Sequence, residues 1–209
     1  MSSSLPPNRL LEIEQALNKR WPENKIEPSL DRIIALLDAL GSPQLSYPTI
    51  HLAGTNGKTT TARMIDQLLT ELGYRVGRYT SPHLESFTER ISIKGAPISD
   101  EMMIKTYDDI ALYLDLIDSR QPIPISYFEG ITAMAFVAFA EYPVDVGVIE
   151  AGMGGQWDAT NVLASLVSVM TPIGFDHMEY LGNTLTEIAQ TKAGIFKPES
   201  NVVLAAQSS

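Results

Sequence analysis

The chain has 209 residues, enough for one large hydrophobic core or for one domain and part of a second. Its 44% hydrophobic and 19% charged residues are typical of a soluble globular protein, and no apolar run approaches the ~18 residues that a membrane span needs. A net charge of −10 disfavours nucleic-acid binding, and the zero cysteines exclude disulfides and thiolate metal sites and favour the cytoplasm.

Two helices are predicted ahead of the first strand. Apolar residues at helical spacing predict one from Leu10 to Trp21, and Ser29 is a candidate N-cap for a second helix from Leu30 to Leu40. We expect residues 1–46 to form a helical extension and residues 47–209 to form a nucleotide-binding domain.

Strands and helices then alternate. In chain order the predicted elements are a strand at 49–52, a helix at 58–72, a strand at 75–79, a half-exposed strand at 90–94, a helix at 99–119, a buried helix at 127–141, strands at 144–149 and 166–170, a helix at 184–195 and a strand at 202–205. This order predicts an α/β fold with a mostly parallel sheet covered by helices. Since no helix follows the last strand, we expect a domain that is incomplete at its C-terminus.

A glycine-rich turn connects the first predicted strand to the next helix. Such a turn, with Lys-Thr at the helix start, binds phosphate through backbone N–H groups and the helix N-terminus. Lys58 would reach the terminal phosphates of a nucleoside triphosphate, and Thr59 would meet the Mg²⁺ bound to them. The usual motif has a glycine where Leu52 stands, so the glycine spacing is short. The predicted phosphate-binding residues are Gly54, Thr55, Asn56, Gly57, Lys58, Thr59 and Thr60.

Three further polar loops follow predicted strands. Parallel strands bring their carboxyl ends to one edge of a sheet, where such folds bind ligands. At Glu150 a carboxylate directly after an apolar strand favours an Mg²⁺ ligand over a capping or salt-bridged glutamate. His177, beside Asp176, is equally consistent with a ligand and with an ordinary hydrogen-bonded histidine. Ser81, just before Pro82, is by itself more typical of a turn.

Three further predictions concern a histidine, a lysine and a group of glycines. His51 lies within a predicted strand and is expected in the core. Lys192 lies on a predicted helix and is expected to be exposed. Gly152, Gly154 and Gly155 do not match a dinucleotide-binding pattern and favour close approach of the backbone to a substrate.

Eight short motifs occur in an order that one known family shares. They are Ala53–Thr59, Thr80–Leu84, Glu89–Ile91, Phe128–Glu129, Gly152–Gly155, Asp158–Asn161, Asp176–His177 and Lys192–Ile195. The chain thereby resembles, from about Leu11 to Ala205, the folylpolyglutamate synthase/dihydrofolate synthase family of the Mur ligase superfamily. The resemblance implies a phosphate-loop NTPase-like Mur ligase ATPase domain and a role in folate biosynthesis.

The resemblance implies an ATP-dependent ligase. ATP would phosphorylate a carboxylate of a pteroate or folyl-glutamate, and the amino group of L-glutamate would attack the acyl phosphate. Family members continue into a part that supplies purine contacts and much of the glutamate site. We therefore expect this chain to be a truncated form or a split gene product that is inactive alone. Dihydrofolate synthase, folylpolyglutamate synthase, another Mur-type ligase and a non-catalytic nucleotide-binding module all stay open.

The resemblance also implies roles for single residues. Ser81 and Glu150 match the ligands of one Mg²⁺, and His177 and Lys192 match those of a second. Lys192 would be carbamylated, which converts its ammonium into a carboxylate-like oxygen ligand. The implied catalytic residues are Lys58, His177 and Lys192. The implied substrate-contacting residues are Ser126, Tyr127, Phe128, Glu129, Trp157, Asp158 and Ala159, with Ile26, Glu27 and Pro28 in a further loop.

Two positions depart from the family pattern. Gln156 stands where arginine is usual, and Thr191 stands where glutamate is common. A missing cation at Gln156 would weaken the binding of an anionic substrate or change its selectivity. We expect small-molecule partners only, without nucleic acid or membrane, and a cytoplasmic protein that is monomeric when full length.

Overall fold

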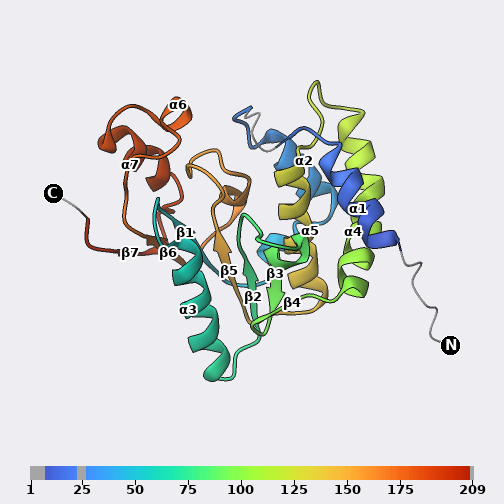
Figure 1. The fold of residues 1–209 in the computed structure, drawn as a ribbon, viewed down its shortest axis with the longest axis horizontal. Helices are drawn as coiled ribbons and strands as arrows, with labels where there is room; N and C mark the ends of the chain where they lie inside the picture. The colour runs from blue at the N-terminus through green and yellow to red at the C-terminus, as the bar shows by residue number, and fades with distance from the viewer. Residues whose placement is uncertain (1–7, 23–26, 208–209) are drawn as a thin grey trace.

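The computed structural model describes residues 8–22 and 27–207. Among these residues, one sheet of seven strands runs through the molecule in the order β4-β3-β2-β5-β1-β6-β7 (Figure 1). The strands are β1 (Thr49–Ala53), β2 (Val76–Tyr79), β3 (Ile91–Ile93), β4 (Ala96–Pro97), β5 (Val146–Glu150), β6 (Val167–Met170) and β7 (Asn201–Leu204). Strands β2, β5, β1, β6 and β7 pair in parallel, whereas β3 and β4 add antiparallel pairs at one edge. The predicted mostly parallel sheet is confirmed.

Helices cover both faces of this sheet (Figure 1). They are α1 (Arg9–Asn18), α2 (Asp31–Ala39), α3 (Lys58–Glu71), α4 (Asp100–Asp118), α5 (Tyr127–Glu141), α6 (Met178–Leu181) and α7 (Leu185–Ala193). Successive residues of a strand point to opposite faces. Leu52 and Val148 accordingly pack with Ala62 of α3, whereas Tyr79 and Ile149 belong to the core on the side of α5.

Side-chain caps set the start of several helices. Ser99 accepts a backbone N–H in the first turn of α4, and Ser126 and Thr184 form capping boxes with a glutamate in α5 and α7. Ser29 accepts the N–H of Asp31 at 3.0 Å, although it stands one position before the N-cap of α2. Local polar residues therefore determine where these helices begin.

The expectation of a half-exposed strand at 90–94 is wrong. Ser92 on β3 is 1% exposed, because its Oγ accepts a hydrogen bond from Nη2 of Arg78 on β2 at 3.0 Å. Arg78 Nε also donates to Oδ2 of Asp66 on α3 at 2.8 Å. A buried ion pair thus joins α3 to β2, and the hydrogen bond from Arg78 to Ser92 explains why a polar residue of the alternating pattern is buried.

The helices α1 and α2 share the main core with α4 and α5. Ile13 and Leu17 of α1 and Leu36 of α2 are fully buried in the same cluster as Ile131 and Phe136 of α5. Helix α5 is buried on nearly all sides, as its continuous apolar sequence predicts. The division at residue 46 stays a prediction.

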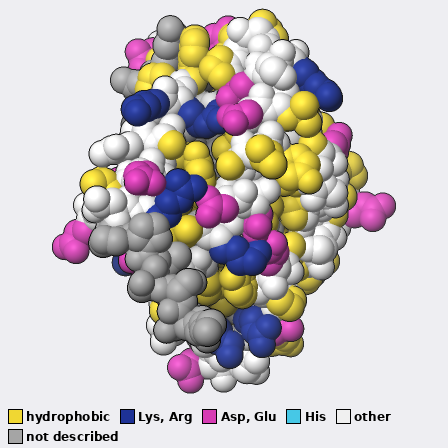
Figure 2. Space-filling model, turned by 90° about the vertical axis from the view of Figure 1, so that its right-hand side faces the viewer, with side chains coloured by type: hydrophobic (Ala, Val, Ile, Leu, Met, Phe, Trp, Pro, Cys, Tyr) yellow, Lys and Arg dark blue, Asp and Glu magenta, His cyan; other side chains and the backbone are white. Residues whose placement is uncertain are grey.

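The surface gives two further observations. Within residues 8–22 and 27–207, no helix is long and apolar enough to cross a membrane. On the face that Figure 2 shows, the Lys and Arg side chains of the described residues alternate with Asp and Glu and form no continuous basic stripe. A basic stripe is the electrostatic footprint of a nucleic-acid surface, so this face does not have the charge pattern for that role.

Candidate active site

The turn between β1 and α3 is hydrogen-bonded to the loop after β6. Thr55 and Asn56 donate their backbone N–H groups to the carbonyl oxygen of Pro172 at 3.0 and 3.1 Å. Gly54 and Gly57 have φ angles of +145° and +81°, which residues with a side chain rarely adopt. The predicted phosphate loop is therefore tied to the loop after β6 and leads into the N-terminus of α3, where an anion is stabilised.

Two lysines meet at this loop. Lys58 Nζ and Lys192 Nζ donate to the same carbonyl oxygen, that of Gly54, at 3.1 and 2.9 Å. Lys192 is 2% exposed, so the expectation of an exposed lysine is wrong. Helix α7 comes close because Gly155 faces it: a Cβ there would lie 2.5 Å from the carbonyl oxygen of Lys192. Burial, together with the charge of Lys58, lowers the pKa of Lys192 to about 8.

Glu150 ends β5 beside the start of α3. The hydroxyl of Thr59 is 3.0 Å from each of its carboxylate oxygens, and the backbone N–H of Ser81 also donates to the carboxylate. Burial raises the pKa of Glu150 to about 7, against the lowering effect of the charge of Lys58. Carboxylate and hydroxyl oxygens next to a phosphate loop are the donors that Mg²⁺ takes, so these residues fit the ion.

His177 lies at the outer end of the site. It is the N-cap of α6 with φ +45°, and its Nε2 is 3.6 Å from Oδ2 of Asp176. The part of the chain that the structure describes contains no group of three or more His, Cys, Asp and Glu side chains able to hold a metal. A second ion between His177 and Lys192 would need an oxygen ligand that an unmodified lysine does not provide.

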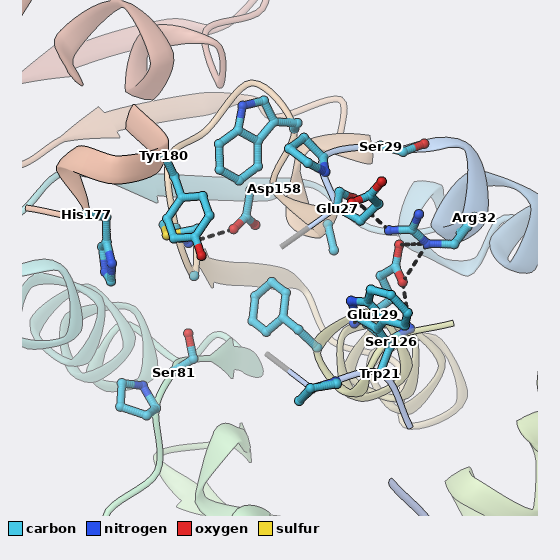
Figure 3. A pocket seen from close by; sticks show the side chains of 18 of the residues that line it. Trp21, Glu27, Ser29, Arg32, Ser81, Ser126, Glu129, Asp158, His177 and Tyr180 are labelled. Atoms are coloured by element: carbon cyan, nitrogen blue, oxygen red, sulfur yellow. Dashed lines mark hydrogen bonds and ion pairs between the residues drawn. The ribbon is translucent and has the colours of Figure 1, made fainter. Parts of the chain in front are cut away.

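A cavity of about 470 Å³ opens beside these loops (Figure 3). Most of the predicted substrate-contacting residues line it, namely Glu27, Pro28, Ser126, Phe128, Glu129, Trp157, Asp158 and Ala159. Two predicted metal ligands, Ser81 and His177, also line it. Tyr127 instead lies in the core, with the guanidinium of Arg90 5.1 Å from its ring centroid. Ile26 lies outside the described residues.

The cavity wall contains Arg90 of the Glu89–Ile91 motif and also residues that the sequence did not identify, among them Trp21, Arg32 and Tyr180. Arg32 Nε donates to both oxygens of Glu129 at 3.0 and 3.2 Å, and its Nη2 donates to the carbonyl oxygen of Glu27 at 3.0 Å (Figure 3). Trp21 forms a parallel bridge with Ser126. The Ser-x-x-Glu pattern at 126–129 marks a helix start, but no local pattern points to its distant partners Arg32 and Trp21.

The glycines of the loop after β5 lie in close contact with neighbouring parts of the protein. A Cβ on Gly152 would lie 2.5 Å from the ring of Phe128, and one on Gly154 would lie 3.1 Å from Leu181. The close approach expected with a substrate is thus made in part with neighbouring side chains and, at Gly155, with α7. The two departures from the family pattern touch each other, since Gln156 donates its N–H to the carbonyl oxygen of Thr191 at 2.9 Å.

The parallel sheet, the phosphate loop and the adjoining cavity define the nucleotide-binding module of a Mur-type ligase. A family model described as the Mur ligase middle domain matches residues 52–208. The chain belongs to the folylpolyglutamate synthase/dihydrofolate synthase family of Mur ligases.

Curated relatives and solved structures agree on this family. The chain is 56% identical over 193 residues to a dihydrofolate synthase/folylpolyglutamate synthase of Mycobacterium tuberculosis, which covers 89% of this chain and 40% of that protein. It is 43% identical over 181 residues to the Bacillus subtilis protein of the same name, covering 86% of this chain and 42% of that protein. The structure of Mycobacterium tuberculosis folylpolyglutamate synthase complexed with ADP has a TM-score of 0.88 and 54% identity, covering 95% of this chain and 45% of the other. The chain therefore spans about 40% of the length of these curated relatives.

Proposed function

We propose that this chain is the part of an ATP-dependent ligase that binds ATP and a pteroate or folyl carboxylate. The observation that carries the proposal is the link between phosphate loop and cavity. Ser81 lines the cavity and donates its N–H to Glu150, which accepts the hydroxyl of Thr59 at the start of α3. Similar proteins have been solved with ADP and with AMPPCP and folate, which supports this pairing of ligands.

The proposed reaction forms one amide bond. The γ-phosphoryl group of ATP is transferred to an oxygen of the substrate carboxylate, and ADP is released. The amino group of L-glutamate then attacks the acyl carbon, and phosphate leaves as the amide forms. The backbone N–H groups at the N-terminus of α3 and the ammonium of Lys58 hold the phosphates, while the cavity orients the carboxylate for in-line transfer.

Mg²⁺ would neutralise charge on the phosphate oxygens. We assign Ser81 and Glu150 to one ion, with Thr59 beside them, and His177 and Lys192 to a second. The assignment of Lys192 depends on carbamylation, and its lowered pKa of about 8 increases the fraction of the neutral amine that reacts with CO₂. Since the chain has zero cysteines, a reducing compartment suits it, and we assign the reaction to the cytoplasm, with a monomeric full-length protein.

Ligand titrations of the 209-residue chain test the proposal. Wild-type protein should bind Mg²⁺–AMPPCP and 7,8-dihydropteroate. Lys58→Met should weaken AMPPCP binding by ~10- to 100-fold, because charge-assisted hydrogen bonds to phosphate are lost, and should leave dihydropteroate binding unchanged. The matched control is Lys19→Met, since Lys19 is exposed at the C-terminal end of α1. A chain that binds a cell-wall precursor in place of dihydropteroate would be a different Mur-type ligase, and one that binds neither would refute the proposal.

Gly152→Ala should narrow the cavity without unfolding the protein. The new methyl group would lie 2.5 Å from the ring of Phe128. The Phe128 side chain can relieve this contact only by rotating about its own bonds. We expect dihydropteroate to bind ~10-fold more weakly and the free energy of unfolding to fall by about 1 kcal/mol. Quenching of tryptophan fluorescence, to which Trp157 in the cavity wall contributes, measures the affinity. The double variant Gly152→Ala/Phe128→Leu should recover part of the dihydropteroate affinity. Wild-type affinity in Gly152→Ala would show that the displaced ring of Phe128 does not narrow the cavity.

A further inference from the structure

A buried chain of hydrogen bonds runs from β1 to the cavity. His51 on β1 is fully buried, and its Nε2 lies 2.8 Å from Oγ1 of Thr160. The Thr160 hydroxyl donates to Oδ1 of Asp158 at 2.5 Å. Asp158 lines the cavity, whereas His51 and Thr160 do not (Figure 3). The strand that leads into the phosphate loop is thus linked to a substrate-facing carboxylate.

The hydrogen-bond acceptors determine which atoms of His51 and Thr160 carry the hydrogens. The carboxylate of Asp158 already accepts the backbone N–H groups of Thr160 and Met153, so the Thr160 hydroxyl acts as a donor to it. The Thr160 oxygen can then only accept from His51, which requires the hydrogen on Nε2. The other ring nitrogen, Nδ1, has no hydrogen-bond partner within the described residues. A bare lone pair there costs less than a buried N–H without an acceptor would.

We propose that His51 and Thr160 are positioning residues that hold the Asp158 carboxylate toward the ligand in the cavity. Oδ1 of Asp158 is occupied by the backbone and the hydroxyl of Thr160. Oδ2 accepts the backbone N–H of Met153 at 2.8 Å, and the carboxylate also accepts the backbone N–H of Gly152. Asp158 therefore fixes the loop after β5 and places a negative charge in the cavity wall. The nature of the ligand in the cavity rests on the proposed function, whereas the hydrogen-bond chain does not. His51 on β1 thereby connects the strand that leads into the phosphate loop with the wall of the cavity.

Substitutions of Thr160 and His51 test the roles of both. Thr160→Val keeps the shape and removes the hydroxyl, so dihydropteroate should bind ~10-fold more weakly while AMPPCP binding is unchanged. Thr160→Ser should bind dihydropteroate like wild type. His51→Leu should weaken binding by ~3- to 10-fold, and His51→Gln, which keeps a donor, should weaken it less. The matched control is Thr106→Val, because Thr106 is fully buried and its Oγ1 has no partner within the described residues.

The double variant separates positioning from general destabilisation. If His51 acts through Thr160, His51→Leu/Thr160→Val should bind dihydropteroate no more weakly than Thr160→Val alone. Losses that simply multiply would overturn the proposal. So would equal weakening of AMPPCP and dihydropteroate binding by Thr160→Val.

A measurement without ligand keeps this inference separate from the proposed function. Nitrogen-15 NMR of the imidazoles should show His51 as the neutral Nε2–H tautomer from about pH 5 to pH 8, with its Nε2 resonance shifted in Thr160→Val. An Nδ1–H tautomer would overturn the inference even if dihydropteroate binds. The expected NMR result with no dihydropteroate binding in wild type would support the hydrogen-bond chain and refute the proposed substrate.

Discussion

Gly54→Ala is expected to collapse the phosphate loop, whereas Gly57→Ala in the same loop is expected to be tolerated. A Cβ on Gly54 would lie 1.9 Å from Oγ1 and 3.0 Å from the carbonyl oxygen of Thr171, and φ there is +145°. The clash involves the backbone after β6 and cannot be relieved by a side-chain rotation alone. A Cβ on Gly57 meets no atom within 4 Å, so only its φ of +81° opposes the substitution.

The expected sizes differ accordingly. Gly54→Ala should lower the free energy of unfolding by about 3 kcal/mol or more and abolish AMPPCP binding. Gly57→Ala should cost about 1 kcal/mol. Urea unfolding of both variants measures the free energy of unfolding, and titration with AMPPCP measures the binding. Adding Thr171→Ala to Gly54→Ala removes the hydroxyl clash and should restore stability only in part, because the carbonyl contact remains. Wild-type stability of Gly54→Ala would contradict the loop geometry.

His51→Gln is expected to reduce the loss of stability in acid. Burial, with a contribution from the charge of Lys197, lowers the pKa of His51 from 6.5 to about 3. Between these values the unfolded chain binds one proton more than the folded chain, so the free energy of unfolding falls as pH falls. The slope approaches about 1.4 kcal/mol per pH unit and vanishes above the unfolded pKa. Between about pH 6.5 and pH 4 the wild type should therefore lose about 3 kcal/mol more than His51→Gln.

Other groups titrate in the same range and must be separated from His51. Burial raises the pKa of Glu150 from 4.5 to about 7, which gives the opposite sign: the folded chain binds the extra proton, and stability increases as pH falls through that window. Because Glu150 is present in both proteins, the comparison of wild type with His51→Gln isolates the histidine. Thr106→Val changes no titrating group and should parallel wild type in urea unfolding across this pH range. A parallel profile for His51→Gln would contradict the assignment of a buried neutral ring.

Much of the fold follows from local pattern. The apolar runs at 144–149 and 166–170 predict β5 and β6, and the strand–glycine turn–helix order predicts the phosphate loop. These features depend on neighbours in sequence, so a single chain reveals them. Strand β4 spans only Ala96–Pro97, too short for a period to show, and the burial of Ser92 depends on Arg78 from another strand.

The candidate site is predicted less completely than the fold, because several of its contacts join residues that are far apart in sequence. The family motifs include half of the residues that line the cavity. Burial of Lys192 depends on how α7 docks against Gly155, which no helical pattern encodes. Tyr127 precedes Phe128 in α5, but the helix turns about 100° between them, so Tyr127 lies in the core while Phe128 lines the cavity. The pairing of Arg32 with Glu129 joins residues 97 positions apart. Such contacts are fixed only when the tertiary structure forms.

The bridge between Trp21 and Ser126 bears on the order of folding. Its residues are far apart in sequence, and Tyr127 reinforces it by donating its N–H to the carbonyl oxygen of Trp21 at 2.9 Å. Closing so long a loop costs chain entropy before any contact offsets it. The same cost applies to the pairing of β1 with β5, which also joins distant residues. Dihydropteroate binding should therefore recover during refolding only once the Trp21–Ser126 bridge and the sheet have both formed.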